Sequence, residues 1–525
     1  MTASHGEDVP NGGIDAEAVV FNPTGVPGLD QVLGGGLPRG ALTLVIGPPG
    51  SGKTTLAVQA AFAAAQAGRR VLILTALSEP TVKLVSHLRT LGFFDQRLVG
   101  DTVQIFNLGQ FLKAGLEATA DALVAAARQQ RAELVVIDGF RGIRGVTEVP
   151  HESRQFLYDI SGRLSTLGAT VIVTNEADLR DATLYSEATT ADVIIELISH
   201  RVGVRQRRGL EVAKIRGLAP LPGLHGFAID KTGVTIYPRL EAQIAATDDS
   251  GTGNEEALRA HPLRDADEPS RVGFDLPELD TMLRGGLTRG TCALLVGRIG
   301  TGKSILGLNF ALAGVRRDEP TLVVGFRESP HELVRKTEPF AIGAEFRAAL
   351  DSGALKLLRL APVELDPDRL TAGILDLLDQ TGAQRLVVDS VSEIERAVSE
   401  QDPGRLSGYL AALVEAMRIR NVTALFTKEL RQVLPSNVDF ADEPLAVLAG
   451  NVLLSRQMEL RSRQYRIMSV LKMGFSDYDP SLREFVITAP EGIRVLAPSD
   501  GDQAMLSEVA EDDSREGKSR RPPVR

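Results

Sequence analysis

The sequence has little of what marks secreted, zinc-binding or membrane-spanning proteins. Its 525 residues include one cysteine, Cys292, so an internal disulfide is excluded. The seven histidines are scattered, and no cysteine–histidine group has the spacing of a zinc site. No run of about 18 apolar residues could cross a bilayer, and the first residues, MTASHGEDVPNGG, contain no apolar signal region. We therefore expect a cytoplasmic protein without a membrane partner.

An excess of positive charge is missing as well. The formal net charge is −10 at pH 7, so the overall field does not favour nucleic acid. Two arginine-rich stretches, at residues 200–209 and 456–466, lack the aromatic interleaving of a base-stacking surface. We expect exposed or subunit-interface hairpins at both places, and no nucleic-acid partner.

What the chain does contain is a long internal repeat. The stretch VPGLDQVLGGGLPRG ahead of GPPGSGKTT returns as LPELDTMLRGGLTRG ahead of GRIGTGKSI. Lys53 and Lys303 are equivalent in the two copies, and Asp138 and Asp389 keep nearly the same spacing downstream. Because the match continues over more than 100 residues, it indicates a duplicated domain and not a short solenoid repeat.

Composition sets the predicted domain boundaries. We expect a disordered segment at residues 1–18, a first domain at 19–242, a linker at 243–269, a second domain at 270–498 and a disordered tail at 499–525. The linker and tail are polar, charged and poor in large apolar residues. Within each domain, short apolar runs alternate with amphipathic stretches, which predicts an α/β fold with a mainly parallel sheet flanked by helices.

Each copy contains the phosphate-binding pattern G-x-x-x-x-G-K-[ST] between a predicted strand and a predicted helix. In such a loop the backbone N–H groups surround phosphate oxygens, the lysine reaches the β- and γ-phosphates, and the hydroxyl binds Mg²⁺. The cofactors implied are ATP and Mg²⁺. The predicted ATP-binding residues are Gly47, Pro48, Pro49, Gly50, Ser51, Gly52, Lys53, Thr54 and Thr55 in the first domain. In the second domain they are Gly297, Arg298, Ile299, Gly300, Thr301, Gly302, Lys303, Ser304 and Ile305.

An apolar strand ending in aspartate follows each loop, as LVVID and LVVD. Behind a phosphate-binding loop, such an aspartate is typical of the Mg²⁺ shell. The predicted metal-binding residues are Thr54, Asp138, Ser304 and Asp389.

Taken together, these motifs resemble the KaiC/RadA branch of the RecA-like P-loop ATPases. The resemblance includes KIRG followed by GFAIDKTGVTIYP late in the first copy, and it covers residues 21–239 and 270–498. The duplication resembles the KaiC group of clock ATPases and autokinases. It implies two tandem RecA-like domains, a homohexameric ring with ATP between neighbouring subunits, and a regulatory protein partner of unknown identity. It also implies that the strand ends VTNEA and FTKEL lie where the γ-phosphate is sensed, with plain strand ends as the alternative.

The family places a pair of glutamates after its second strand, one of which orients the attacking water or deprotonates an acceptor hydroxyl. Here Glu79 and Glu328 match the second glutamate and are the catalytic candidates. Ser78 and Arg327 occupy the position of the first. A serine cannot act as a carboxylate base, and an arginine places a fixed positive charge there. An alternative is that both glutamates are only exposed carboxylates at a helix start.

The family also supplies basic residues from the neighbouring subunit to the γ-phosphate. The matching residues are Lys214 and Arg216 in the first domain and Lys472 in the second, where Gly474 replaces the arginine. An arginine finger contributes about 10³–10⁵ in rate in related systems, so we expect slower hydrolysis in the second domain. An alternative is that Lys214 and Arg216 are ordinary exposed strand residues.

The phosphoacceptor stays unknown. The autophosphorylated Ser-Thr pair of the family aligns with Leu445 and Ala446, which have no hydroxyl, and no motif singles out the nearby Ser436 or Ser455. The sequence thus predicts a tandem ATPase in which slow hydrolysis drives a conformational switch for partner binding, with Ser/Thr autokinase activity as a family implication. The alternatives are a nucleotide-gated scaffold without kinase activity and a DNA-dependent ATPase.

Overall fold

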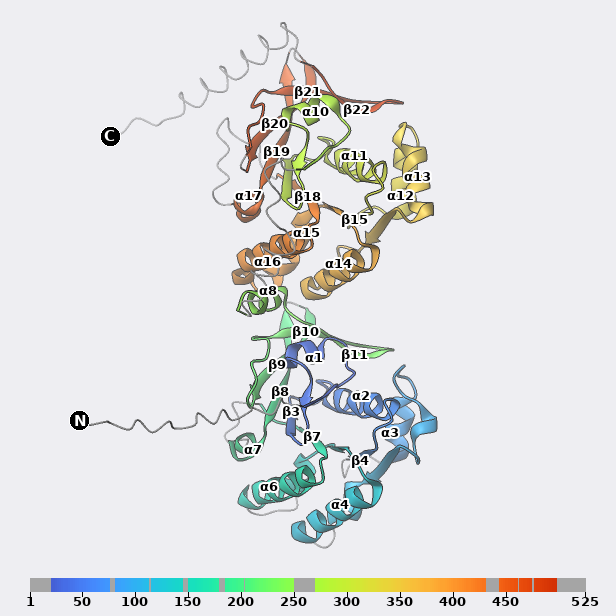
Figure 1. Ribbon diagram of the computed structural model, residues 1–525, viewed down its shortest axis with the longest axis vertical. Coiled ribbons are helices and arrows are strands. Elements are labelled where there is room, and N and C mark those ends of the chain that lie inside the picture. The colour runs from blue at the N-terminus through green and yellow to red at the C-terminus, as the bar shows by residue number, and fades with distance from the viewer. Residues whose placement is uncertain are drawn as a thin grey trace, which may run out of the picture. The chain divides into compact units, whose positions relative to one another are not determined.

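The computed structural model describes residues 20–75, 81–112, 115–144, 150–178, 185–202, 204–249, 270–430, 443–460, 462–474 and 476–497. The chain divides into two compact units, residues 1–238 and 239–525 (Figure 1). The predicted disordered segment at residues 1–18 and the whole of the predicted tail at 499–525 lie outside the described residues. So do residues 250–269 of the predicted linker.

The first unit is built on a nine-stranded sheet in the order β11-β10-β9-β8-β3-β7-β6-β4-β5. The strands from β8 to β5 in this order pair in parallel, and β9, β10 and β11 add an antiparallel extension. The strands are β3 (Leu42–Ile46), β4 (Val71–Thr75), β5 (Val103–Asn107), β6 (Leu134–Ile137), β7 (Thr170–Asn175), β8 (Val193–Val202), β9 (Arg205–Ile215), β10 (His225–Asp230) and β11 (Gly233–Tyr237).

Helices cover both faces of this sheet because alternate strand residues are apolar on each side. Val45, Ile73 and Val136 pack with helices α1, α2 and α3 in one core, whereas Leu44 and Leu72 pack with α4 and α6 in the other. The helices are α1 (Leu29–Leu33), α2 (Lys53–Gln66), α3 (Thr81–Leu88), α4 (Leu116–Gln130), α5 (Arg141–Arg144), α6 (Pro150–Thr166) and α7 (Tyr185–Thr190).

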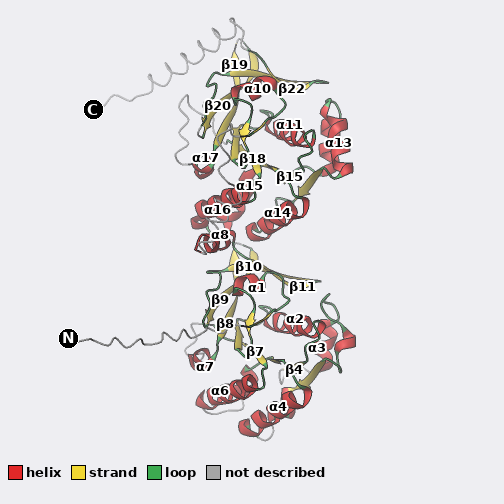
Figure 2. Cartoon of the chain, in the orientation of Figure 1, coloured by secondary structure: helices red, strands yellow, loops and turns green. Residues whose placement is uncertain are grey.

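The second unit repeats this plan, with a nine-stranded sheet in the order β16-β15-β17-β18-β14-β19-β20-β21-β22 (Figure 2). Its strands are β14 (Cys292–Gly297), β15 (Thr321–Gly325), β16 (Leu355–Arg359), β17 (Arg385–Asp389), β18 (Thr423–Glu429), β19 (Asn451–Leu460), β20 (Arg463–Met473), β21 (Arg483–Thr488) and β22 (Gly492–Val495). Its helices are α8 (Leu240–Asp249), α10 (Pro277–Met282), α11 (Lys303–Val315), α12 (Pro330–Thr337), α13 (Ile342–Ser352), α14 (Pro367–Thr381), α15 (Val391–Gln401), α16 (Leu406–Ile419) and α17 (Pro444–Leu448). The predicted fold class, two tandem RecA-like α/β domains, is confirmed.

Helix α8 belongs to the second unit, although the sequence prediction placed residues 243–269 in a linker. Leu240 is buried in a core of that unit. Glu241 accepts hydrogen bonds from Arg405 at 2.8 and 3.0 Å, and Arg405 also donates to the buried Asp368 at 2.7 Å. Residues 243–249 are therefore held in a helix by contacts that are far away in sequence.

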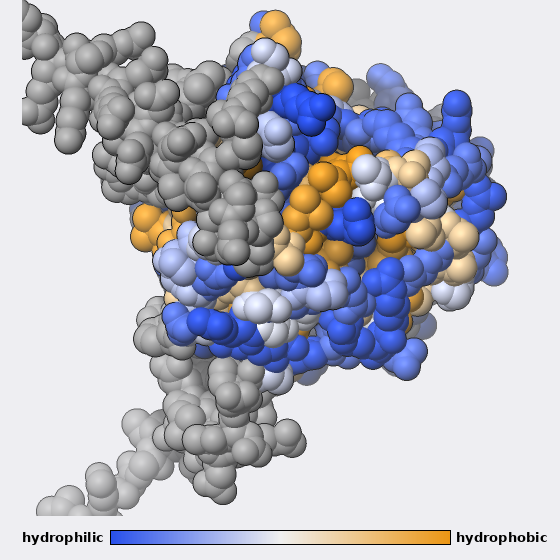
Figure 3. Space-filling model, turned by 90° about the horizontal axis from the view of Figure 1, so that it is seen from above, coloured by the Kyte–Doolittle hydropathy of each residue, from blue (hydrophilic) through white to orange (hydrophobic). Residues whose placement is uncertain are grey.

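The visible surface is mostly polar. Figure 3 shows one face, on which hydrophilic residues surround a band of hydrophobic ones. Among the described residues, no helix is both long and apolar enough to cross a membrane.

Candidate nucleotide-binding sites

Both phosphate-binding loops lie at the carboxyl end of the central strand of their sheet, directly before a helix. The first connects β3 to α2, and the second connects β14 to α11. A Cβ atom at Gly47 would lie 2.4 Å from the carbonyl oxygen of Leu197, and one at Gly297 would lie 2.5 Å from that of Ser455. Glycine is therefore required at the start of each loop, because the next strand passes so close to it.

The lysine of each loop turns back onto its own loop. The Lys53 ammonium donates to the carbonyl oxygens of Gly47 at 2.9 Å and Pro48 at 2.8 Å. The Lys303 ammonium does the same with Gly297 at 3.0 Å and Arg298 at 2.8 Å. Burial lowers the pKa of both lysines. Each ammonium is thus already inside the loop, where phosphate oxygens would replace the carbonyl partners.

In the first domain, the residues predicted to hold Mg²⁺ are in contact. Thr54 donates to the Asp138 carboxylate, with Oγ1 2.9 and 3.0 Å from its two oxygens. Asp138 is buried and also accepts from Thr174 at 2.6 Å. A hydroxyl and a carboxylate are the oxygen ligands that Mg²⁺ prefers, and in ATP sites the phosphates complete its shell. The donor set therefore fits Mg²⁺ bound together with ATP.

In the second domain, the same residues are arranged less tightly. Asp389 accepts a hydrogen bond from Thr427, as Asp138 does from Thr174. Ser304 is exposed, and among the described residues no hydrogen bond joins Ser304 to Asp389 in the way that Thr54 is joined to Asp138.

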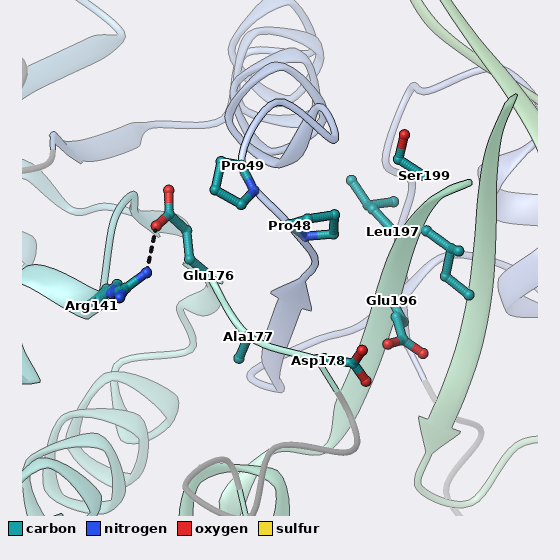
Figure 4. A pocket seen from close by; sticks show the side chains of 10 residues that line it. Pro48, Pro49, Arg141, Glu176, Ala177, Asp178, Glu196, Leu197 and Ser199 are labelled. Carbon is teal, nitrogen blue, oxygen red and sulfur yellow. Dashed lines mark hydrogen bonds and ion pairs between the residues drawn. The ribbon is translucent and has the colours of Figure 1, made fainter. Parts of the chain in front are cut away.

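A glutamate stands at the carboxyl end of the strand beside each loop and is paired with an arginine. In the first domain, Glu176 follows β7, and its carboxylate lies 3.1 Å from Arg141 of α5. Both line a pocket of about 270 Å³ next to Pro48 and Pro49 of the loop. Figure 4 shows Arg141 and Glu176 on one side of the loop and Ser199 of β8 on the other. The open space beside the loop is therefore bounded by polar and charged side chains.

In the second domain, the equivalent glutamate is Glu429, and its partner comes from a different element. Arg327, in the loop after β15, donates to the Glu429 carboxylate at 2.7 and 3.1 Å. Arg327 also lies 3.5 Å from Glu393 of α15. Sequence reasoning named Arg327 as a departure from the family, but it missed Glu429, Glu393 and Arg141. Aligning VTNE with FTKE would have identified Glu429.

Of the two catalytic candidates, the structure describes Glu328 alone. Glu79 and Ser78 are outside the described residues. Glu328 pairs with Lys336 of α12 at 2.8 Å on the surface, which suits its alternative interpretation as an exposed carboxylate at a helix start.

The basic residues predicted to reach the γ-phosphate of a neighbouring subunit, called the trans fingers below, make the same kind of contact in both domains. Lys214 and Arg216 donate to the carbonyl oxygens of Ala188 and Thr189 at 3.0 and 2.9 Å, where α7 ends. Lys472 donates to the carbonyls of Ala446 and Val447 at 3.1 and 2.9 Å, near the end of α17. A bulge lies directly beside each lysine: Lys214 pairs with Ile194 and Lys472 with Val452, and the register shifts between residues 194 and 195 and between 452 and 453. Such bulges re-aim side chains.

The positions aligned with the family's phosphoacceptors are buried. Leu445 and Ala446 lie in α17 and are almost inaccessible to solvent. Ser455 is also buried and donates to the carbonyl of Thr301 in the phosphate-binding loop at 3.1 Å. Ser436 is outside the described residues.

Comparisons with known proteins agree with this geometry. A family model for the KaiC ATPase matches residues 22–241 and 273–500. The chain is 25% identical over 491 residues to the circadian clock oscillator protein KaiC of Synechococcus elongatus. This match covers 91% of the chain and 90% of the relative. It is 26% identical over 477 residues to the circadian clock protein KaiC3 of a Synechocystis species, covering 88% and 89%. Since the family match spans both duplicated domains, the chain belongs to the KaiC family of ATPases.

Proposed function

We propose that this chain assembles into a homo-oligomeric ring in which each phosphate-binding loop holds MgATP at a subunit interface. The first domain hydrolyses ATP, and the second retains it with much slower turnover. The cycle of binding and hydrolysis switches the conformation that a partner protein recognises. Bound Mg²⁺ would neutralise phosphate charge, with Thr54 and Asp138 as its protein contacts in the first domain and Ser304 and Asp389 in the second.

The observation that carries this proposal is the position of the trans fingers. Lys214 and Arg216 donate to the carbonyls of Ala188 and Thr189 in α7 and not to the phosphate-binding loop of their own domain. Arg216 also pairs with Asp192 at 3.4 Å, and its side chain is 57% exposed. A half-exposed guanidinium held this way is available to a neighbouring subunit.

Exposed apolar residues support the same subunit interface. Ile299, in the tip of the second loop, is 73% exposed. Val447, Leu448 and Leu471 are exposed beside Lys472. Apolar side chains on both the loop side and the finger side are expected where one copy packs head-to-tail on the next.

The unequal surroundings of the two loops support unequal rates. The second domain has Gly474 in place of the finger arginine and Arg327 in place of a carboxylate base. The first domain also lacks that carboxylate, with Ser78 in its place, so the second domain differs by its missing finger arginine and by the fixed positive charge of Arg327. An autokinase activity would need an acceptor outside the buried positions 445 and 446, so we do not include one in the proposal.

Two loop variants test the proposal. Lys53→Ala should abolish steady-state ATP hydrolysis, and Lys303→Ala should leave most of it. Size-exclusion chromatography with and without ATP should show nucleotide-dependent assembly. Full hydrolysis in Lys53→Ala, or a monomer under both conditions, would contradict the proposal.

A further inference from the structure

Arg327 is held at a fixed place at the carboxyl edge of the second sheet. The preceding Phe326 is fully buried. Two residues further on, Ser329 begins α12 with a capping box, in which it exchanges hydrogen bonds with Glu332. β15 itself ends beside the predicted metal aspartate, because Gly325 is the register partner of Asp389. The base of the Arg327 side chain is therefore anchored on both sides.

The guanidinium reaches toward the phosphate-binding loop. Glu429, which it contacts through both terminal nitrogens, is the register partner of Gly297, the first residue of the loop. The Arg327–Glu429 pair therefore lies at the strand ends where the phosphate-binding loop begins.

Glu429, the partner of Arg327, presents a carboxylate, which a guanidinium binds much as it binds a phosphate group. A guanidinium binds carboxylate and phosphate in the same two-pronged geometry. The Arg327 side chain is 51% exposed, so it can exchange one oxygen pair for another with little rearrangement. A second acidic residue, Glu393 at 3.5 Å, shares the site.

We propose that Arg327 binds the γ-phosphate of ATP in cis, as a contact that holds bound ATP and not as a replacement for the rate-enhancing finger arginine that is missing at Gly474. When ATP enters, Arg327 leaves Glu429 for the terminal phosphate. The second domain then distinguishes ATP from ADP through a residue of its own chain. This inference rests on the proposed function, since it needs ATP in the second loop.

The test is the affinity of the second site for ATP and ADP, measured by equilibrium dialysis of radiolabelled nucleotide on the full-length chain. All variants also carry Lys53→Ala, which silences the first site. Arg327→Ala should raise the Kd for ATP about 10- to 100-fold, the loss expected for one charge-assisted contact. The Kd for ADP should change less than about threefold. Arg396→Ala, which removes another arginine paired with Glu393, is the matched control and should leave both values unchanged.

Glu429→Gln separates phosphate binding from a structural role. If Arg327 binds phosphate, losing its competitor Glu429 should leave ATP binding unchanged or tighter. Equal losses of ATP and ADP affinity in Arg327→Ala would overturn the inference. So would a loss in Glu429→Gln as large as that in Arg327→Ala. If the Lys53→Ala chain binds no ATP, or if adding Lys303→Ala does not abolish binding, the proposed function itself fails.

Discussion

Replacing Arg216 by alanine should slow ATP hydrolysis in the first domain by about 10³- to 10⁵-fold, the contribution of an arginine finger. This corresponds to about 4–7 kcal/mol of transition-state stabilisation. The structural cost should be small, because Arg216 is half-exposed and makes one surface ion pair and one helix-end hydrogen bond. Such surface contacts contribute about 0–1 kcal/mol. The effect on rate should therefore greatly exceed the effect on folding.

The assay is single-turnover hydrolysis in a Lys303→Ala background, so that only the first site is read. Arg201→Ala, which removes an exposed arginine from β8, is the control and should turn over normally. Thermal unfolding should show a shift of no more than about 4 °C for Arg216→Ala. A normal hydrolysis rate in Arg216→Ala would refute the role of this residue.

Mixing two inactive variants tests whether the finger acts between subunits. Lys53→Ala subunits keep Arg216, and Arg216→Ala subunits keep the loop. A mixed ring would contain interfaces that combine an intact loop with an intact finger, so activity should return. Mixtures that stay inactive although the subunits co-assemble would show that Arg216 does not act in trans.

Two further predictions concern a buried ion pair and the metal site. Glu319→Gln should destabilise the second unit by about 3–5 kcal/mol, because it leaves the buried Arg385, whose Nε lies 2.7 Å from Glu319, without its counter-charge. Burial opposes ionisation of Glu319, but its arginine partners hold its pKa below the usual value, so this stability is present above about pH 4.5 and lost as the pH falls through the folded pKa. Glu345→Gln, which alters a more exposed ion pair, is the control. Equal shifts in the thermal unfolding temperature of both variants would contradict the larger contribution of the buried pair. Asp138→Asn should raise the Mg²⁺ concentration for half-maximal hydrolysis about 10- to 100-fold. Asp159→Asn, on the surface of α6, is the control and should leave the Mg²⁺ titration unchanged. An unchanged titration in Asp138→Asn would contradict the assignment of Asp138 to the metal site.

The sequence predicted the tandem fold well, because its signals are local. The apolar runs before Gly47 and Gly297 and the lysine-headed helices after them are short-range patterns, and they lie where the structure has β3, α2, β14 and α11. Helix α8, in contrast, was not predicted from the sequence. Its sequence, LEAQIAATDD, has few large apolar residues, and it is held through Glu241 by Arg405, 164 residues away.

The candidate sites were predictable in their motifs and not in their contacts. Lys53, Thr54 and Asp138 can be named from spacing, and the structure brings the last two together. The Arg327–Glu429 contact joins residues 102 positions apart, one in the loop after β15 and the other at the end of β18. Its existence depends on β15, β17, β18 and β14 lying side by side in one sheet, which spacing along the chain does not encode.

The most direct test of unequal sites is the identity of the nucleotides that the chain retains. The protein is incubated with MgATP, desalted rapidly and denatured, and the released nucleotides are quantified per chain. We predict ADP from the first domain and intact ATP from the second, with the ATP fraction lost in Lys303→Ala and the ADP fraction lost in Lys53→Ala. Equal conversion of both nucleotides to ADP in the wild-type chain would contradict a hydrolysing first domain beside a nucleotide-retaining second domain.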